Sequence, residues 1–312
     1  MRYIISGIGK GSGGVGDYMQ FIDENFKNEN FKIITPIRLK IKNKYLAKLS
    51  DIISVNFFFR IKLLFLPKND LTIVAQQFLG YSIMKNLLKR FNNIHLYIMD
   101  NSFFCLKSYN HIKNQNKACY KCLGGNFNNA LINNCSSLPI QIPRKKFIKL
   151  NNLLLDYSSS IKFYFLSNQN ALLAKKHFGN QINYEIMHHI TDELNPNLIV
   201  REKDINLKFD FVLHAVNIDA KGFSYTIDLA SKMSEYSFFI PTNKKISLSN
   251  VTTSNVRWES GFKKIVTNSK IILTPSFWSY TPETSSLKSF LYNGCVAMIE
   301  NDYNYSKDIP EN

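Results

Sequence analysis

Strand-like and helix-like runs alternate along the whole of this sequence, and this alternation limits the folds it can adopt more than any other feature. Short apolar runs are separated by segments in which apolar residues recur every three or four positions. Strands that alternate with helices form parallel sheets, so the pattern predicts an α/β protein with doubly wound, Rossmann-like sheets. The predicted strands are residues 2–8, 31–35, 71–76, 94–99, 161–166, 182–187, 209–215, 236–240, 271–274 and 296–299. The predicted helices are residues 17–26, 81–91, 168–178, 223–235, 258–268 and a segment that begins near Thr284.

The length of the chain predicts two domains. Its 312 residues, of which 45% are hydrophobic, are enough to bury two cores. A polar stretch that includes Pro196, residues 191–197, interrupts both periodicities and marks the boundary. We therefore expect an N-terminal domain at 1–190, with a Cys-rich insertion at 101–140, and a C-terminal domain at 191–312. Ligands of such sheets bind at the carboxyl ends of the strands, which predicts a site in a cleft between the two domains.

The excess of positive charge is confined to the first predicted domain. Residues 1–190 contain 26 Lys and Arg against 9 Asp and Glu, whereas residues 191–312 contain 13 against 14. Such an asymmetry favours an anionic partner, although solubilising lysines would give the same excess. Within residues 38–66 the basic residues alternate with Leu, Ile and Phe, as in segments that lie on anionic membrane surfaces. The alternative is a helix whose Phe57, Ile61 and Leu64 face the domain core.

Other locations and partners are disfavoured. Arg60 and Lys62 exclude a simple membrane span within the basic segment, and no uncharged apolar run reaches about 18 residues. Lys10 and the neighbouring glycines interrupt any secretory signal, so we expect a cytoplasmic protein that is peripheral at the inner membrane face. No DNA- or RNA-binding motif is present, which makes nucleic acid an unlikely partner.

The stretch GIGKGSGGVGD, residues 7–17, is dense in glycine and leads from the first strand into a helix. Glycines allow the backbone to approach a ligand closely, and a helix N-terminus attracts a phosphate. G-x-G-x-x-G occurs twice, but the second predicted strand is followed by Arg38 and not by the acidic residue that holds the ribose of NAD. An NADP-dependent oxidoreductase is therefore one candidate, a phosphate site of another kind is a second, and a tight turn without a ligand is a third.

Three stretches together resemble the GT-B glycosyltransferases, specifically the family-4-like group of bacterial surface-polysaccharide enzymes. Gly13-Gly14-Val15-Gly16 is similar to the GGVG turn that lies beside the donor phosphate and the acceptor in that family. Residues 213–230 resemble the strand, turn and Lys-Gly that open the nucleotide-binding domain. Residues 271–300 resemble the segment that normally carries the paired glutamates. The resemblance implies a metal-independent, retaining transfer of a sugar from a nucleotide sugar, UDP- or GDP-linked, to a glycan or lipid-linked glycan of a surface polysaccharide such as lipopolysaccharide.

The resemblance and the chemistry assign roles in the C-terminal domain. A leaving diphosphate needs positive charge, which Lys221 and the N-terminus of the helix that carries Ser285 and Ser286 can supply. Glu283 takes the position of the family's first glutamate and would bind sugar hydroxyls. Lys221 as a solvated turn residue, and Glu283 as a plain helix-capping partner, are the alternatives.

This sequence also departs from the family pattern. Ser289 stands where the second, ribose-binding glutamate is usual, Val216 stands where an arginine is usual, and Thr281 competes with Glu283 for the first glutamate's place. Relatives also continue beyond the strand at 296–299, which suggests a truncated C-terminal domain. These differences leave a catalytically inactive, glycan-binding relative as an alternative.

Two further groups of residues are candidates for the first domain. Asp100 directly follows a strand and would orient the acceptor or act as a base, or else cap the next turn. His188-His189 near the boundary is interpreted as structural.

Cys105, Cys119, Cys122 and Cys135 have spacings that fit a structural zinc site, with His111 as a substitute ligand and free thiols or disulfides as alternatives. Cys295 is expected to be buried in a strand.

Overall fold

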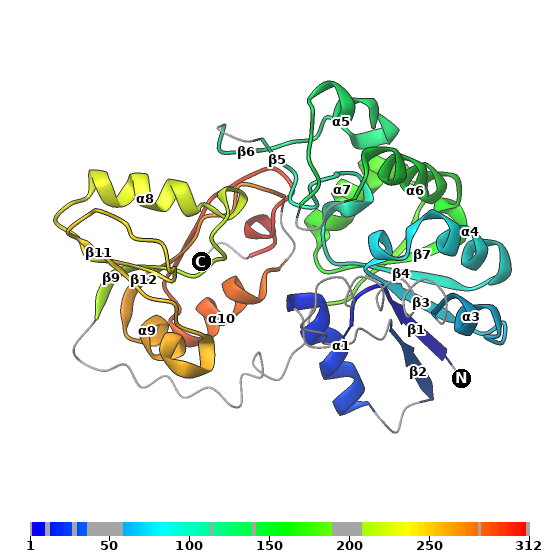
Figure 1. Cartoon of the computed structure of the whole chain (residues 1–312), viewed down its shortest axis with the longest axis horizontal. Coiled ribbons are helices and arrows are strands. Elements are labelled where there is room, and N and C mark those ends of the chain that lie inside the picture. The colour runs from blue at the N-terminus through cyan, green and yellow to red at the C-terminus, as the bar shows by residue number, and fades with distance from the viewer. Residues whose placement is uncertain are drawn as a thin grey trace, which may run out of the picture. The chain divides into compact units, whose positions relative to one another are not determined.

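The computed structural model describes residues 2–9, 13–26, 30–35, 59–112, 115–138, 142–188, 208–279 and 282–309. The chain forms two compact units (Figure 1). The first comprises Met1–Ser108 and Lys121–Thr191, and the second comprises Tyr109–Tyr120 and Asp192–Asn312. Residues 109–120 therefore belong to the second unit, although they lie within the insertion expected in the first domain. The predicted boundary at 191–197 and the basic residues 38–58 lie outside the described residues.

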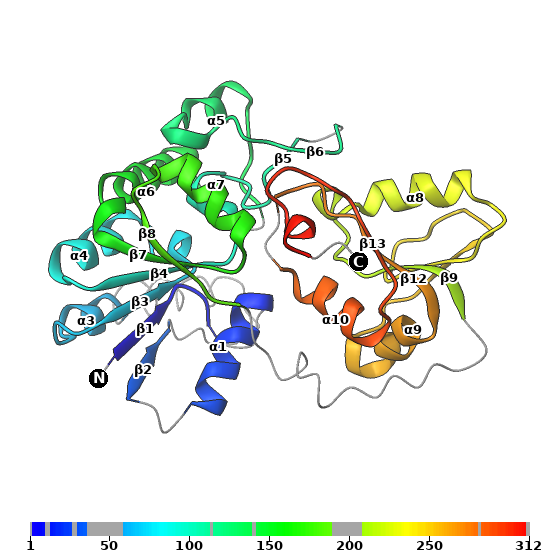
Figure 2. The ribbon, with the colours of Figure 1, turned by 180° about the vertical axis from the view of Figure 1, so that it is seen from behind.

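The first unit is built on a six-stranded sheet in which every described pair of neighbouring strands is parallel. The strand order is β2-β1-β3-β4-β7-β8, so the order reverses between β1 and β3. Helices cover both faces of the sheet (Figures 1 and 2). The strands are β1 (Arg2–Ser6), β2 (Phe31–Ile34), β3 (Leu71–Val74), β4 (Ile94–Ile98), β7 (Ile161–Phe165) and β8 (Asn183–Ile186). The helices are α1 (Gly13–Asn25), α3 (Phe59–Leu64), α4 (Gly80–Arg90), α5 (Asn128–Ile132), α6 (Arg144–Asp156) and α7 (Asn168–Phe178), with short 3₁₀ turns η2 (Gln76–Phe78), η3 (Asn101–Phe103), η4 (Leu123–Gly125) and η5 (Ser158–Ser160).

The central strands follow from their composition. β3 and β4 are runs of apolar residues whose side chains are buried on both faces, as in sheets that carry helices on each side. No helix is predicted between the strands at 94–99 and 161–166, yet α6 lies there. Pro143 precedes its first turn, and Phe147, Leu150 and Leu154 form a buried stripe at helical spacing. This amphipathic pattern is local, so the sequence carries the signal for a helix at 144–156 and its absence from the predicted elements was wrong.

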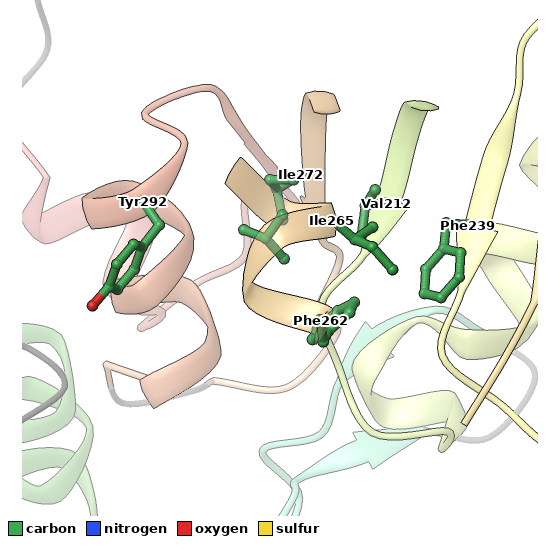
Figure 3. Packing of buried hydrophobic residues seen from close by; sticks show 7 residues of the cluster. Val212, Phe239, Phe262, Ile265, Ile272 and Tyr292 are labelled. Atoms are coloured by element: carbon green, nitrogen blue, oxygen red, sulfur yellow. The ribbon is translucent and has the colours of Figure 1, made fainter. Parts of the chain in front are cut away.

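The second unit contains a five-stranded parallel sheet in the order β11-β10-β9-β12-β13. Its order reverses between β9 and β12. Side chains from three of its strands and the adjoining helical segments face one another in a single apolar cluster (Figure 3). The elements are β9 (Phe209–Leu213), η8 (Asp219–Lys221), α8 (Phe223–Lys232), β10 (Phe238–Ile240), β11 (Val251–Thr253), the π-helical turn η9 (Trp258–Phe262), α9 (Lys263–Thr267), β12 (Ser269–Thr274), α10 (Thr284–Tyr292), β13 (Val296–Met298) and η10 (Tyr305–Asp308). A small antiparallel hairpin, β5 (His111–Ile112) and β6 (Lys117–Ala118), completes the unit.

The two parallel sheets confirm the predicted doubly wound α/β class. No helix in the described ranges is both long enough and apolar enough to cross a bilayer.

One buried group of the first unit makes its stability depend on pH. His177 lies among the rings of Phe103, Phe104, Phe127 and Phe178. Neither ring nitrogen has a hydrogen-bond partner within the described part of the chain. Burial without a partner disfavours the charged imidazolium and lowers the pKa of His177 to about 3. The unfolded chain binds a proton near its ordinary pKa of about 6.5, so the stabilising contribution is complete above that value and is lost as the pH falls towards 3.

We expect the His177→Phe variant to lose less stability in acid than the wild type does. The phenylalanine ring fills the same aromatic cage and takes up no proton when the chain unfolds. Between a pH of about 7.5 and about 5, the fall in the free energy of unfolding should be smaller in the variant by about 2 kcal/mol. Urea denaturation followed by circular dichroism at both pH values measures this difference. Equal pH dependence in the two proteins would contradict the assignment.

Candidate functional site

Two loops of the second unit meet at the carboxyl ends of β9 and β12, where the strand order reverses. The loop after β9 leads through η8 to Lys221, and the loop after β12 leads to Glu283 at the start of α10. Lys221 Nζ lies 3.1 Å from Glu283 Oε2, although 62 positions separate the two residues. Ligands of open α/β sheets bind at such a reversal point, because the neighbouring loops diverge there. This edge is therefore the candidate site of the second unit.

The carboxylate of Glu283 is held by four donors. Oε1 accepts from Ser276 Oγ at 3.1 Å and from Trp278 Nε1 at 2.9 Å. Oε2 accepts from Lys221 Nζ at 3.1 Å and from Ser285 Oγ at 3.3 Å. Glu283 is the backbone N-cap residue of α10, but its side chain makes no capping hydrogen bond. Three of the four donors lie outside α10, so the carboxylate is not a plain capping partner.

Lys221 is a mostly buried cation with two neighbours. Burial by itself lowers the pKa of Lys221, but Glu283 and Tyr109 together outweigh that effect and the net pKa lies above the ordinary value. The ammonium also lies 5.3 Å from the centroid of the Tyr109 ring, within the range of a cation–π interaction. The side chain is therefore a charged lysine, fixed in direction, rather than a solvated turn residue.

Gly222 allows the Lys221 turn to pack against the loop after β12. Its φ is +76°, a conformation that side-chain-bearing residues rarely adopt. A Cβ at this position would lie 2.4 Å from both Cγ and the carbonyl oxygen of Pro275. The backbone amide of Phe277 donates to the carbonyl of Ala220 at 2.9 Å and closes the same contact. The Lys-Gly pair of the sequence motif thus has a steric reason.

The start of α10 has the properties of an anion site. The first amide groups of any helix lack acceptors within the helix, and here no side chain of Glu283 caps them. Ser286 Oγ and Thr274 Oγ1 are buried and have no hydrogen-bond partner within the described residues. Unpaired hydroxyls of this kind are costly unless a ligand or water pairs with them. Ser285 and Ser286 are thus placed at a helix N-terminus that suits a phosphate.

Ser289 has a different environment from the other predicted donor-binding residues. It is fully buried, donates to the carbonyl of Ser285 at 2.8 Å and accepts from His214 Nδ1 at 2.8 Å. His214 stacks on Trp258, and burial together with the charges of Lys288 and Lys221 lowers the pKa of His214 to about 3. A neutral histidine therefore donates to Ser289. The role of Ser289 in donor binding stays a prediction, because both of its hydrogen bonds are made within the protein.

The predicted residues of the first unit lie at the carboxyl ends of β1 and β4. Gly13, Gly14 and Gly16 form the first turn of α1, which begins four residues earlier than predicted. Asp100 accepts from the amide of Ser102 at 2.8 Å and from Gln77 Nε2 at 3.2 Å, so it caps η3. Burial raises the pKa of Asp100, although these hydrogen bonds oppose the rise. A raised pKa also suits a general base, and that role stays a prediction.

The structure does not support the predicted zinc site. The described residues include all four predicted ligands, yet they contain no group of three or more His, Cys, Asp or Glu side chains that could hold a metal. Cys119 belongs to the second unit, whereas Cys105, Cys122 and Cys135 belong to the first. None of these four cysteines forms a disulfide within the described residues, and Cys295, which was expected to be buried, is exposed. Close spacing in sequence thus did not produce a group of three metal-binding side chains among the described residues.

Comparison with solved structures identifies the fold. A structure from E. coli described as trehalose-6-phosphate bound with UDP-2-fluoro glucose is similar at a TM-score of 0.56 and 10% identity, over 99% of this chain and 86% of that one. An α,α-trehalose-phosphate synthase (UDP-forming) from Burkholderia vietnamiensis is similar at a TM-score of 0.53 and 8% identity, over 97% and 85%. These neighbours are GT-B glycosyltransferases. The chain has a GT-B fold. No family model matches the sequence, and a search of curated proteins finds no match.

The sequence motifs indicate the two charged residues of this candidate site but not the groups around them. Tyr109, His214, Ser276 and Trp278 were not predicted as partners. Ser276 and Trp278 stand in the stretch that resembles the family, so their closeness to Glu283 was within reach of a sequence argument. Tyr109 and His214 are 112 and 75 positions away from Lys221 and Ser289, which they contact, and no local signal announces such pairs.

We expect the Gly222→Ala substitution to destabilise the second unit more than Gly294→Ala does. Gly294 also has a positive φ of +87°, but a Cβ there would meet nothing within 4 Å. The two variants share the conformational cost, and the clash with Pro275 should add about 1–3 kcal/mol at Gly222. Both tryptophans of the chain, Trp258 and Trp278, lie in this unit, so urea denaturation followed by tryptophan fluorescence measures its unfolding. Equal stabilities would show that the loop after β12 moves away without cost.

Proposed function

We propose that this protein is a glycosyltransferase that moves a sugar from a nucleotide-sugar donor to a glycan acceptor. The observation that supports the proposal most is the Lys221–Glu283 pair, which lies beside the N-terminus of α10 at the reversal point of a GT-B unit. It brings a cation, free helix amides and a fixed carboxylate to one edge. A nucleotide sugar needs the first two for its diphosphate and the third for its sugar hydroxyls.

The leaving diphosphate accumulates negative charge as the glycosidic bond breaks. An ammonium group has three donors, and Lys221 uses one of them on Glu283, which leaves two directions for phosphate oxygens. The amide groups of the first turn of α10 add partial positive charge without having to reorganise. Charge placed in advance where charge develops is the largest contribution that a site of this kind makes to rate.

Glu283 would bind the hydroxyls of the transferred sugar. A carboxylate has about four acceptor positions, and all four are occupied by protein donors in the structure. The hydroxyls of Ser276 and Ser285 can rotate away, whereas the indole of Trp278 cannot. A sugar would therefore replace one or both serine hydroxyls while Lys221 and Trp278 keep the carboxylate in place.

The finer parts of the proposal rest on resemblance. Glycosyltransfer with retention is the subject of work on a trehalose-6-phosphate synthase that is similar at a TM-score of 0.56 and 11% identity, which supports a retaining reaction. The E. coli and Burkholderia neighbours favour a UDP-linked donor over a GDP-linked one. We further propose that Asp100 and the glycines at the start of α1 serve the acceptor side, and that the acceptor is a lipid-linked glycan of a surface polysaccharide.

The Lys221→Met variant should bind UDP about tenfold to hundredfold more weakly than the wild type, because one charge-assisted contact to the diphosphate is lost. Lys232→Met is the matched control, since Lys232 lies on α8 of the same unit and pairs only with the exposed Asp228 among the described contacts. Isothermal titration measures the affinities. A preceding thermal-shift panel of UDP-, GDP-, ADP-, CMP- and dTDP-sugars identifies the base. The proposed function fails if none of these nucleotides binds, or if the Lys221 variant binds as tightly as the control.

We propose that the first unit docks on an anionic membrane through the surface between α3 and α4. A groove of about 140 Å³ runs between the two helices and is mostly apolar. Arg90 on α4 donates to the carbonyls of Leu63 and Leu66 and fixes the end of α3. There Leu64 and Phe65 are 56% and 81% exposed. Residues 59–68 and 80–90 carry six Lys and Arg and no acidic residue, which suits anionic headgroups around an inserted apolar tip.

Replacing both Leu64 and Phe65 by serine should weaken binding to vesicles of phosphatidylcholine and phosphatidylglycerol by about tenfold or more, because two large apolar side chains no longer enter the bilayer. Ile132→Ser is the control, as Ile132 is an equally exposed residue on α5 of the same unit. Co-sedimentation measures the bound fraction. Binding that persists in the double variant, or that is unaffected when phosphatidylglycerol is left out, would contradict this surface.

A further inference from the structure

The hairpin β5–β6 is inserted between elements of the first unit but is built into the second. The chain leaves the first unit after Ser108 and returns to it at Lys121 (Figure 1). Between these points His111 pairs with Ala118, and Ile112 pairs with Lys117. A hairpin with so few pairs is not stable alone, so its position depends on what it contacts.

Polar contacts at the base of the hairpin anchor it to the loop between β12 and α10. The side-chain oxygen of Asn110, a fully buried residue, accepts from the amide of Ser279 at 3.0 Å. Tyr120 Oη lies 2.7 Å from Ser279 Oγ and donates to the carbonyl of Asp302 at 2.5 Å. Burial raises the pKa of Tyr120 to about 12, so the hydroxyl keeps its proton. The residues that flank the hairpin thus contact both the backbone and the side chain of Ser279.

The loop between β12 and α10, which contains Ser279, also orients Glu283. Ser276 and Trp278 from this loop donate to the carboxylate, and the amide of Phe277 ties the loop to η8, which carries Lys221. The hairpin therefore contacts the loop that in turn contacts Glu283 and the turn that carries Lys221.

One residue of the hairpin segment reaches the site itself. The Tyr109 ring packs against Trp278 with a centroid distance of 4.8 Å and an interplanar angle of 60°. Lys221 Nζ lies 5.3 Å from the centroid of the same ring. Lys221 is thus held by the carboxylate of Glu283 and by the ring of Tyr109. A lysine side chain has a flexible four-carbon stem, and two fixed neighbours restrict where its ammonium can point.

We propose that Tyr109 is a positioning residue of the donor site, which directs the Lys221 ammonium towards the diphosphate through its ring. This inference takes its ligand, the diphosphate, from the proposed function. The contact between Tyr109 and Lys221 is independent of that function. Without the ring, Glu283 alone would determine the direction of the ammonium, and water would reach it. The hairpin then serves to supply Tyr109 from a distant part of the chain to the second unit.

A double-mutant cycle tests whether Tyr109 acts through Lys221. Tyr109→Leu should weaken UDP binding by about threefold to thirtyfold, the range of a cation–π contact, whereas Tyr109→Phe keeps the ring and should bind like the wild type. In the Lys221→Met background, Tyr109→Leu should have no further effect. Tyr184→Leu is the control, because it removes a ring 4.7 Å from Lys175 in the first unit. An equal loss in both backgrounds would show a merely structural role and overturn the proposal.

A second measurement needs no nucleotide. An amine-acetylating reagent is added to the folded protein, and mass spectrometry follows the modification of Lys221. The rate of this modification should rise severalfold in Tyr109→Leu and stay at the wild-type value in Tyr109→Phe. Failure of the wild type to bind UDP would count against the proposed function alone. An unchanged Lys221 acetylation rate in Tyr109→Leu would overturn the role of Tyr109, whatever the protein binds.

Discussion

The ion pair between Lys221 and Glu283 is the interaction on which the candidate site depends. Two charges that leave water lose several kcal/mol of hydration each, and only good geometry with further hydrogen bonds compensates for this loss. Here Ser276, Trp278 and Ser285 satisfy the carboxylate, and Tyr109 faces the ammonium. Each of these groups must be in place for the pair to remain buried. The pair therefore links four chain segments: η8, the loop after β12, the start of α10 and Tyr109, which lies two residues before β5.

The backbone beneath the pair explains why it forms at this edge. The sheet of the second unit grows outward from β9 in both directions, so the loops after β9 and β12 separate at their junction. The apolar cluster in Figure 3 fixes these strands against α9 and α10. Gly222 permits a close approach to Pro275 that any side chain would prevent. Packing, topology and one glycine thus place a lysine and a glutamate at hydrogen-bonding distance.

The first unit combines a similar sheet with different surface chemistry. Its reversal point lies between β1 and β3, and Gly13, Gly14 and Gly16 lie in the first turn of α1. Asp100 lies two residues after β4 and is a capping residue whose pKa is raised by burial. The α3–α4 surface adds exposed apolar side chains among basic ones. The proposed acceptor-side and membrane-docking roles of this unit rest on these features, whereas the charged pair lies in the second unit.

The sequence by itself determined the local elements and the identity of the charged pair. Helix 168–178 and strands such as 94–98 follow from periodicity over neighbouring residues, and Lys221 and Glu283 follow from short motifs, because both kinds of signal are local. The tertiary structure alone decided which distant groups meet. It paired His214 with Ser289, placed Tyr109 against Lys221, and assigned Cys119 to the second unit and the other three candidate ligands to the first. Such contacts depend on how distant loops pack against one another, and the periodicity of a single sequence does not predict that packing.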